Sequence, residues 1–256
     1  MPATHDEIAA IERGAAQNLA AYVDAYREVA PEIRADSIEI AGGVAAFCGA
    51  ESPLTTVKGV GGQVSPGDCE RVERFFREHG ATVATFECAP WLSESSRPLF
   101  AQRGYRESTQ EHVLVRRQVV HEQPTLNVEP FPVNDWAEVM RRGFELPDSP
   151  AMQALVNSAG ALHDARLWGV QHEGAWITCA QSVRYGTVAI FGCDGTLPEA
   201  RGRGAQRALI LHRLREIGPE AIVTAEVAPD SVSERNYLRC GFEIAYARMH
   251  FTRQLH

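Results

Sequence analysis

The order of apolar and polar residues predicts a chain of helices and strands that follow one another closely. The clearest helix spans residues 5–29, because apolar side chains recur there at spacings of three and four, and Pro31 ends it. A second helix begins with Ser65 as N-cap and Pro66 at its first position, and ends at Gly80. The first half also predicts strands near residues 38–48, 54–60, 81–88 and 109–117, and a helix near 93–103.

The second half of the chain repeats this order. A polar stretch at residues 118–125 indicates a linker between the two halves. After it the pattern predicts strands near 126–131, 166–172, 175–184, 187–194, 221–227 and 242–252, and helices near 134–144, 150–159, 204–217 and 232–240.

Two short matches support an internal duplication. Glu87-Cys88-Ala89-Pro90 is matched by Glu226-Val227-Ala228-Pro229, and Gly104-Tyr105 by Gly241-Phe242, at nearly the same offset. The alternative is that two α/β segments look alike because all strand-helix-strand units do. We therefore expect an α/β protein of two similar domains, residues 1–120 and 121–256.

Composition excludes several classes of function. The chain has 256 residues, 45% of them hydrophobic, and a formal net charge of -8, which argues against a generic nucleic-acid binder. No apolar run approaches the ~18 residues of a membrane span, so we expect no membrane partner. Six scattered cysteines without a C-x-x-C pair indicate reduced thiols in a cytoplasmic protein, and the histidines lack metal-ligand spacing, so no metal is expected.

A glycine- and arginine-rich loop carries the strongest chemical signal. It follows a predicted strand and leads into a predicted helix. Glycines let a ligand approach the backbone, and the first N–H groups of a helix, with the helix dipole, attract anions. Residues 201–217 contain five arginines and one glutamate, so the loop predicts an anion-binding site, with a solvated basic helix and a flexible entry loop as the alternative. The residues of the predicted site are Arg201, Gly202, Arg203, Gly204, Ala205, Gln206 and Arg207.

This loop resembles the R/Q-x-x-G-x-G/A pyrophosphate loop of the GNAT acyltransferase superfamily, with Gln206 in place of the last small residue. Tyr237, four residues before Gly241-Phe242, resembles the tyrosine that the superfamily places before a Gly-Phe pair. The resemblance implies two tandem domains, each a mixed sheet flanked by helices with two parallel strands that splay apart. It also implies acetyl-CoA as acyl donor, with its pyrophosphate on the amides of residues 202–207.

Three residues are candidates for catalysis by this resemblance. Tyr237 occupies the position of the general acid that protonates the leaving thiolate, with a half-buried packing residue as the alternative. Asp194, at the end of the strand before the loop, and Glu226, near the end of the next strand, are candidate bases. Water in place of a dedicated base stays open as well.

The first half lacks the residues that carry this chemistry. Its corresponding loop, residues 58–67, contains glycines but no arginine, and Phe100 occupies the tyrosine position. We therefore expect a degenerate first domain and a second domain that transfers an acyl group from CoA to an amine, on a small molecule or a peptide. A CoA-binding sensor without turnover is the main alternative, and a nucleotide-phosphate binder of another class is a third. The sequence does not indicate the acceptor or the oligomeric state.

Overall fold

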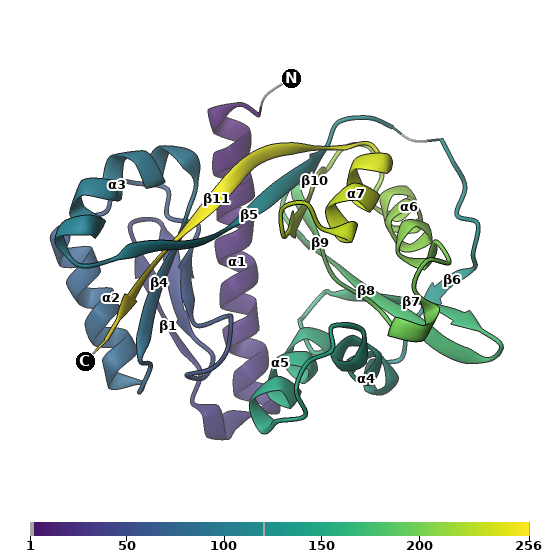
Figure 1. The fold of residues 1–256 in the computed structure, drawn as a ribbon, viewed down its shortest axis with the longest axis horizontal. Coiled ribbons are helices and arrows are strands. Elements are labelled where there is room, and N and C mark those ends of the chain that lie inside the picture. Colours follow the sequence, from purple (N-terminus) through teal and green to yellow (C-terminus); the bar gives the residue numbers. More distant parts are fainter. Residues whose placement is uncertain (1–2, 120, 256) are drawn as a thin grey trace. The chain divides into compact units, whose positions relative to one another are not determined.

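The computed structural model describes residues 3–119 and 121–255, and the chain divides into two compact units (Figure 1). The first unit comprises Met1–His112 and Ala245–His256, and the second comprises Val113–Ile244. This division differs from the predicted domains 1–120 and 121–256, because the C-terminal strand, expected to complete the second domain, belongs to the first unit. That strand pairs antiparallel with a strand of the first half, from Met249 opposite Cys88 to Gln254 opposite Val83.

The first unit is a mixed sheet with helices. Its strand order is β1-β2-β3-β4-β11-β5, with β3 and β4 parallel. Strand β5 begins in this unit and ends in the second, and β11 begins in the second and ends here. The elements are α1 (His5–Val29), β1 (Asp36–Ile40), β2 (Gly43–Phe47), β3 (Thr56–Lys58), α2 (Pro66–Glu78), β4 (Val83–Cys88), α3 (Pro90–Gln102), β5 (Arg106–Arg116) and β11 (Phe242–Gln254), with a 3₁₀ turn at Pro31–Ile33.

The second unit repeats the same arrangement. Its strands follow the order β5-β10-β9-β8-β7-β6, with β9 and β10 parallel. The elements are β6 (Val128–Pro130), α4 (Val133–Gly143), α5 (Pro150–Gly160), β7 (Arg166–His172), β8 (Ala175–Tyr185), β9 (Val188–Thr196), α6 (Ala205–Ile217), β10 (Ile222–Val227) and α7 (Val232–Arg239), with a 3₁₀ turn at Pro198–Ala200 before α6.

Nearly every predicted element is present, and one predicted strand is wrong. Residues 38–48 form two strands, β1 and β2, because Ala41 and Gly42 both adopt positive φ angles, of 47° and 86°, and close a tight hairpin. Part of the predicted linker 118–125, residue 120, lies outside the described residues.

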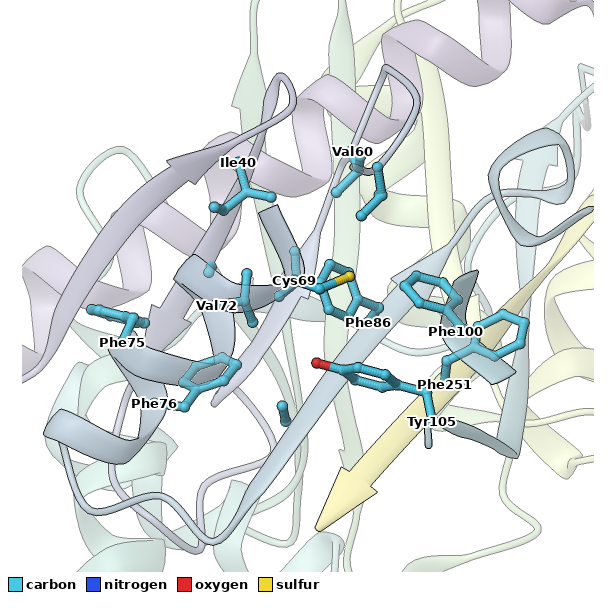
Figure 2. Packing of buried hydrophobic residues seen from close by; sticks show 14 of the residues in the cluster. Ile40, Val60, Cys69, Val72, Phe75, Phe76, Phe86, Phe100, Tyr105 and Phe251 are labelled. Carbon is cyan, nitrogen blue, oxygen red and sulfur yellow. The ribbon is translucent and has the colours of Figure 1, made fainter. Parts of the chain in front are cut away.

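Aromatic side chains fill the core of the first unit (Figure 2). Strand alternation sends Ala84, Phe86 and Cys88 of β4 to one face, where they meet residues of α2 and α3. Phe100 of α3 is fully buried there, with ring centroids 5.0 Å from Phe86 and 4.9 Å from Phe251. The residue that replaces the expected tyrosine is therefore part of the hydrophobic core.

No helix among the described residues is both long and apolar enough to cross a membrane. All six cysteines are free thiols, five of them buried and Cys193 partly buried.

Candidate functional site

The predicted phosphate loop lies at an open helix start. Gly202 and Gly204 adopt left-handed φ angles of 81° and 79°, which glycine tolerates best. Gly204 is the N-cap of α6, and no side chain caps this helix. A Cβ atom at either glycine would meet nothing within 4 Å. The first N–H groups of α6 therefore face open space and remain available to an anion.

A cavity of about 710 Å³ opens above this helix start, within the second unit. All seven residues predicted to bind the cofactor line it, together with Asp194 and Thr196 of β9 and residues of α7. The α7 residues are Val232, Ser233, Asn236 and Arg239. The structure thus brings together the predicted loop and one of the three predicted catalytic residues, Asp194.

The cavity is rich in positive charge. Four arginines line it, and three of them, Arg201, Arg203 and Arg239, are exposed. Arg201 pairs with Glu145 at 2.7 Å and donates to the Gly143 carbonyl at 3.2 Å. Arg207 donates two hydrogen bonds to Glu122, and these bonds raise the pKa of Arg207. A ligand with several phosphate charges fits this set of donors.

Gln206, the departure from the superfamily motif, points toward α7. Its amide nitrogen donates to Ser233 Oγ at 2.8 Å and lies 3.4 Å from Asp194 Oδ2, and its amide oxygen accepts from Asn236 at 2.8 Å. The side chain therefore joins α6 to α7 inside the cavity and leaves the backbone of the loop open.

Tyr237 and Asp194 belong to one buried network. The Tyr237 hydroxyl donates to Asp194 Oδ2 at 2.6 Å, and burial, reinforced by the Asp194 charge, raises the pKa of Tyr237 well above 10. Arg213 of α6 donates to Asp194 Oδ2 at 2.9 Å, and its guanidinium forms an ion pair with Asp194 Oδ1 at 2.8 Å. Tyr237 is 2% exposed and is not one of the residues that line the cavity. Its predicted role as general acid stays a prediction.

Sequence reasoning missed Arg213, although a signal was present. Arg213 lies four residues after Leu209 and three after Ile210, on the apolar face of α6. A charged residue at such a position is buried with a partner or disrupts the core. Only the fold shows that the partner is Asp194.

Glu226, the other candidate base, is partly buried on β10 and does not line the cavity. On β10, Val223, Ala225 and Val227 face the core shared with α6 and α7, so alternation sends Glu226 to the opposite face. Its counterpart in the first unit, Glu87, is buried and pairs with Lys58 at 2.9 Å. The catalytic assignment of Glu226 stays a prediction.

Glu87 also belongs to a cluster of three side chains, found among the described residues, that lie close enough together to hold a metal ion. Its carboxylate, that of Glu111 and the ring of His250 offer ligand atoms within 4.8 Å of one another. The Lys58 ammonium, 2.9 Å from Glu87 and 3.8 Å from Glu111, already provides positive charge at this place.

In the first unit, the helix start that corresponds to the start of α6 is capped by side chains. Ser65 and Asp68 form a capping box at the start of α2, in which Ser65 Oγ accepts from the Asp68 N–H at 3.1 Å and Asp68 Oδ2 accepts from the Ser65 N–H at 3.0 Å. Hydrogen bonds from Ser65 lower the pKa of Asp68. A carboxylate thus occupies the place where a phosphate would bind, and the loop has no arginine.

Comparison with known proteins defines the class of fold. No protein-family model matches the sequence, and no curated protein matches it either. Among solved structures, the chain is similar to proteins with the GNAT N-acetyltransferase fold, and its two units repeat that fold in tandem.

Three of these structures cover most of the chain. A GCN5-related N-acetyltransferase from Kribbella flavida is 14% identical, with a TM-score of 0.58 over 91% of this chain and 95% of that chain. A tandem GNAT protein from the clavulanic acid biosynthesis pathway is 16% identical, with a TM-score of 0.58 over 87% and 83% of the two chains. A functionally unknown conserved protein from Staphylococcus epidermidis is 13% identical, with a TM-score of 0.58 over 80% and 87%. These comparisons establish the fold.

Proposed function

We propose that this protein is an acyl-CoA-dependent N-acyltransferase, with acetyl-CoA as donor and a primary amine, on a small molecule or a peptide, as acceptor. The observation that carries the proposal is the cavity at the start of α6, where an uncapped helix, two left-handed glycines and four arginines converge. The tandem GNAT fold supports the same conclusion.

The proposed cofactor contacts follow from this geometry. The amides at the start of α6 hold the pyrophosphate of CoA, and Arg201 and Arg203 add charge-assisted hydrogen bonds to the phosphates. On the α7 side, Gln206 is held by Ser233 and Asn236 and leaves the backbone amides of the loop available to the pyrophosphate.

The proposed reaction is a direct transfer. The amine nitrogen attacks the thioester carbonyl, a C–N bond forms and the C–S bond breaks. The ammonium proton passes to water, and the CoA thiolate leaves and takes up a proton. Metal chemistry has no part in this proposal.

Thiol release from acetyl-CoA, measured with a panel of amines, tests the function. We expect release that depends on one class of amine and produces the N-acetyl product by mass spectrometry. CoA binding without thiol release for any amine would support a CoA sensor, and tighter binding of a nucleotide than of CoA would support the nucleotide-binding alternative.

A further inference from the structure

Arg213 is fully buried at the centre of the second unit and satisfies its donors within the protein. Besides Asp194, its guanidinium donates to the Gln181 carbonyl of β8 at 2.8 Å and to the Leu209 carbonyl of its own helix at 3.2 Å. It lies over the Phe191 ring, 4.4 Å from the centroid, and 3.4 Å from the Tyr237 hydroxyl. One side chain therefore ties α6 to β8, β9 and α7.

The partner of Arg213 lies at an irregular point of β9. The register between β8 and β9 shifts between Cys179 and Gln181, and Cys193 adopts a positive φ of 56°. This bulge carries one extra residue on β9 and turns the Asp194 side chain toward α6 and α7. Asp194 then accepts hydrogen bonds from Arg213 and Tyr237, and its side chain is 6% exposed.

This buried pair also reaches the cavity. Asp194 lines the cavity wall, and Gln206 connects Asp194 to Ser233 and Asn236 of α7. The position of the β9 bulge relative to the start of α6 therefore depends on the Arg213–Asp194 pair. The bulge and the helix start line the same cavity, so under the proposed function their relative position affects how the acyl donor is aligned.

We propose that Arg213 is a positioning residue for acyl transfer. Through Asp194 it fixes the bulged end of β9 against α6 and α7, and Asp194 and Tyr237 serve in this network instead of acting as base and acid. Asp194 Oδ2 accepts hydrogen bonds from both Arg213 and Tyr237, and Asp194 Oδ1 lies in the ion pair, 2.8 Å from the Arg213 guanidinium, so the carboxylate is held by its charged partner. The Tyr237 hydroxyl, which donates to this carboxylate, is directed away from a leaving thiolate. This inference rests on the proposed transferase function.

The central test replaces Arg213 with lysine, which keeps the charge but cannot make the same set of planar, diverging hydrogen bonds. We expect kcat to fall by ~10–100-fold, because a small misplacement of reacting groups has an effect of that order. The Kd for CoA should change less than about threefold, because the phosphates bind the loop at residues 201–207.

Arg248 provides the matched control. It lies on β11 in the first unit, is as fully buried as Arg213, and pairs with Glu12 at 2.7 Å. Arg248→Lys should lower the thermal stability of the chain but leave kcat, KM and the CoA Kd of the folded protein unchanged. Unchanged kcat in Arg213→Lys, or the same fall in Arg248→Lys, would overturn the positioning role.

Two further variants keep the inference testable if Arg213→Lys does not fold. Asp194→Asn should reduce kcat as Arg213→Lys does, and the double variant should lose about as much as either single one, because the pair acts as a unit. Tyr237→Phe should keep kcat within ~10-fold of wild type and keep its pH profile. A fall of ~10²–10⁴ with loss of an alkaline limb would instead identify Tyr237 as the general acid and overturn the proposal.

The wild-type assay distinguishes failure of the proposed transferase function from failure of the positioning role. A wild-type protein that binds no CoA and releases no thiol contradicts the transferase function itself, and the positioning role with it. A wild-type protein that turns over normally, with Arg213→Lys and Asp194→Asn equally active, contradicts only the positioning role.

Discussion

Arg201 illustrates how single residues of the site are held before a ligand arrives. Its guanidinium pairs with the Glu145 carboxylate, and both side chains are at least half exposed. Such exposed pairs contribute little to stability, so a phosphate can replace Glu145 as the partner at small cost. Arg201 therefore lines the cavity and can exchange its Glu145 partner for a phosphate.

We expect Arg201→Ala to weaken CoA binding by ~1–3 kcal/mol, the range for a hydrogen bond to a charged group. Glu145→Gln, which releases Arg201, should leave CoA affinity equal or tighter. Calorimetry checks both. Arg215, which donates to Gln123 and does not line the cavity, is the control. An equal loss in Arg215→Ala would show that only general charge matters.

The sequence predicted some residues of the site better than others, for a physical reason. Residues 201–207 are adjacent in the chain, so their loop and helix start could be predicted locally, and all of them line the cavity. Arg213 and Tyr237 depend on a partner that lies far away in the sequence. Helical spacing indicates which face of α6 or α7 they occupy, but only the fold brings Asp194 between them.

At the scale of elements, the two units differ most in how one helix begins. Helix α2 starts with a capping box whose carboxylate satisfies the local donors, whereas α6 starts with a glycine and no side-chain cap. The same position in the repeat is therefore closed in the first unit and open to anions in the second.

Ser65→Ala should destabilise the chain by ~1 kcal/mol, as loss of an N-cap typically does, and leave CoA affinity unchanged. Chemical denaturation and calorimetry measure the two effects. Weaker CoA binding in this variant would contradict the assignment of a closed, ligand-free helix start to the first unit.

Most elements could be predicted because their periodicity and caps are local features. The exception is residues 38–48, where the prediction of one strand passed over Gly42-Gly43, a pair typical of a tight turn. Apolar alternation alone does not show the positive φ angle of Ala41, and here the glycine pair was the local signal for the hairpin.

At the scale of the whole molecule, the last strand of the sequence, β11, joins the sheet of the first unit. We call this arrangement the strand exchange. The last residues of β11 pair with β4 and contribute Phe251 to the core of the first unit. A strand pattern shows which residues face a core but not which sheet they join. The sequence therefore predicted the strand and its alternation, whereas its place in the first unit required the fold.

Phe251→Ala should destabilise the first unit by ~3–5 kcal/mol, the usual effect of removing a buried phenylalanine side chain. Denaturant unfolding of the full chain measures this loss, and folded protein should keep its CoA affinity. Val29→Ala, at an exposed position of α1, is the control and should change stability by less than ~0.5 kcal/mol. A negligible effect of Phe251→Ala would contradict the strand exchange.

The most direct test of the account is a calorimetric titration of the full chain with CoA. We predict one CoA per chain, with binding abolished by Gly204→Val, whose side chain would occupy the open space above the start of α6. Gly80→Val, at the end of α2, has the same left-handed φ and equally open surroundings, so it imposes similar backbone strain and should bind CoA like wild type. Two CoA molecules per chain, or normal affinity in folded Gly204→Val, would contradict a single acyl-CoA site at the start of α6.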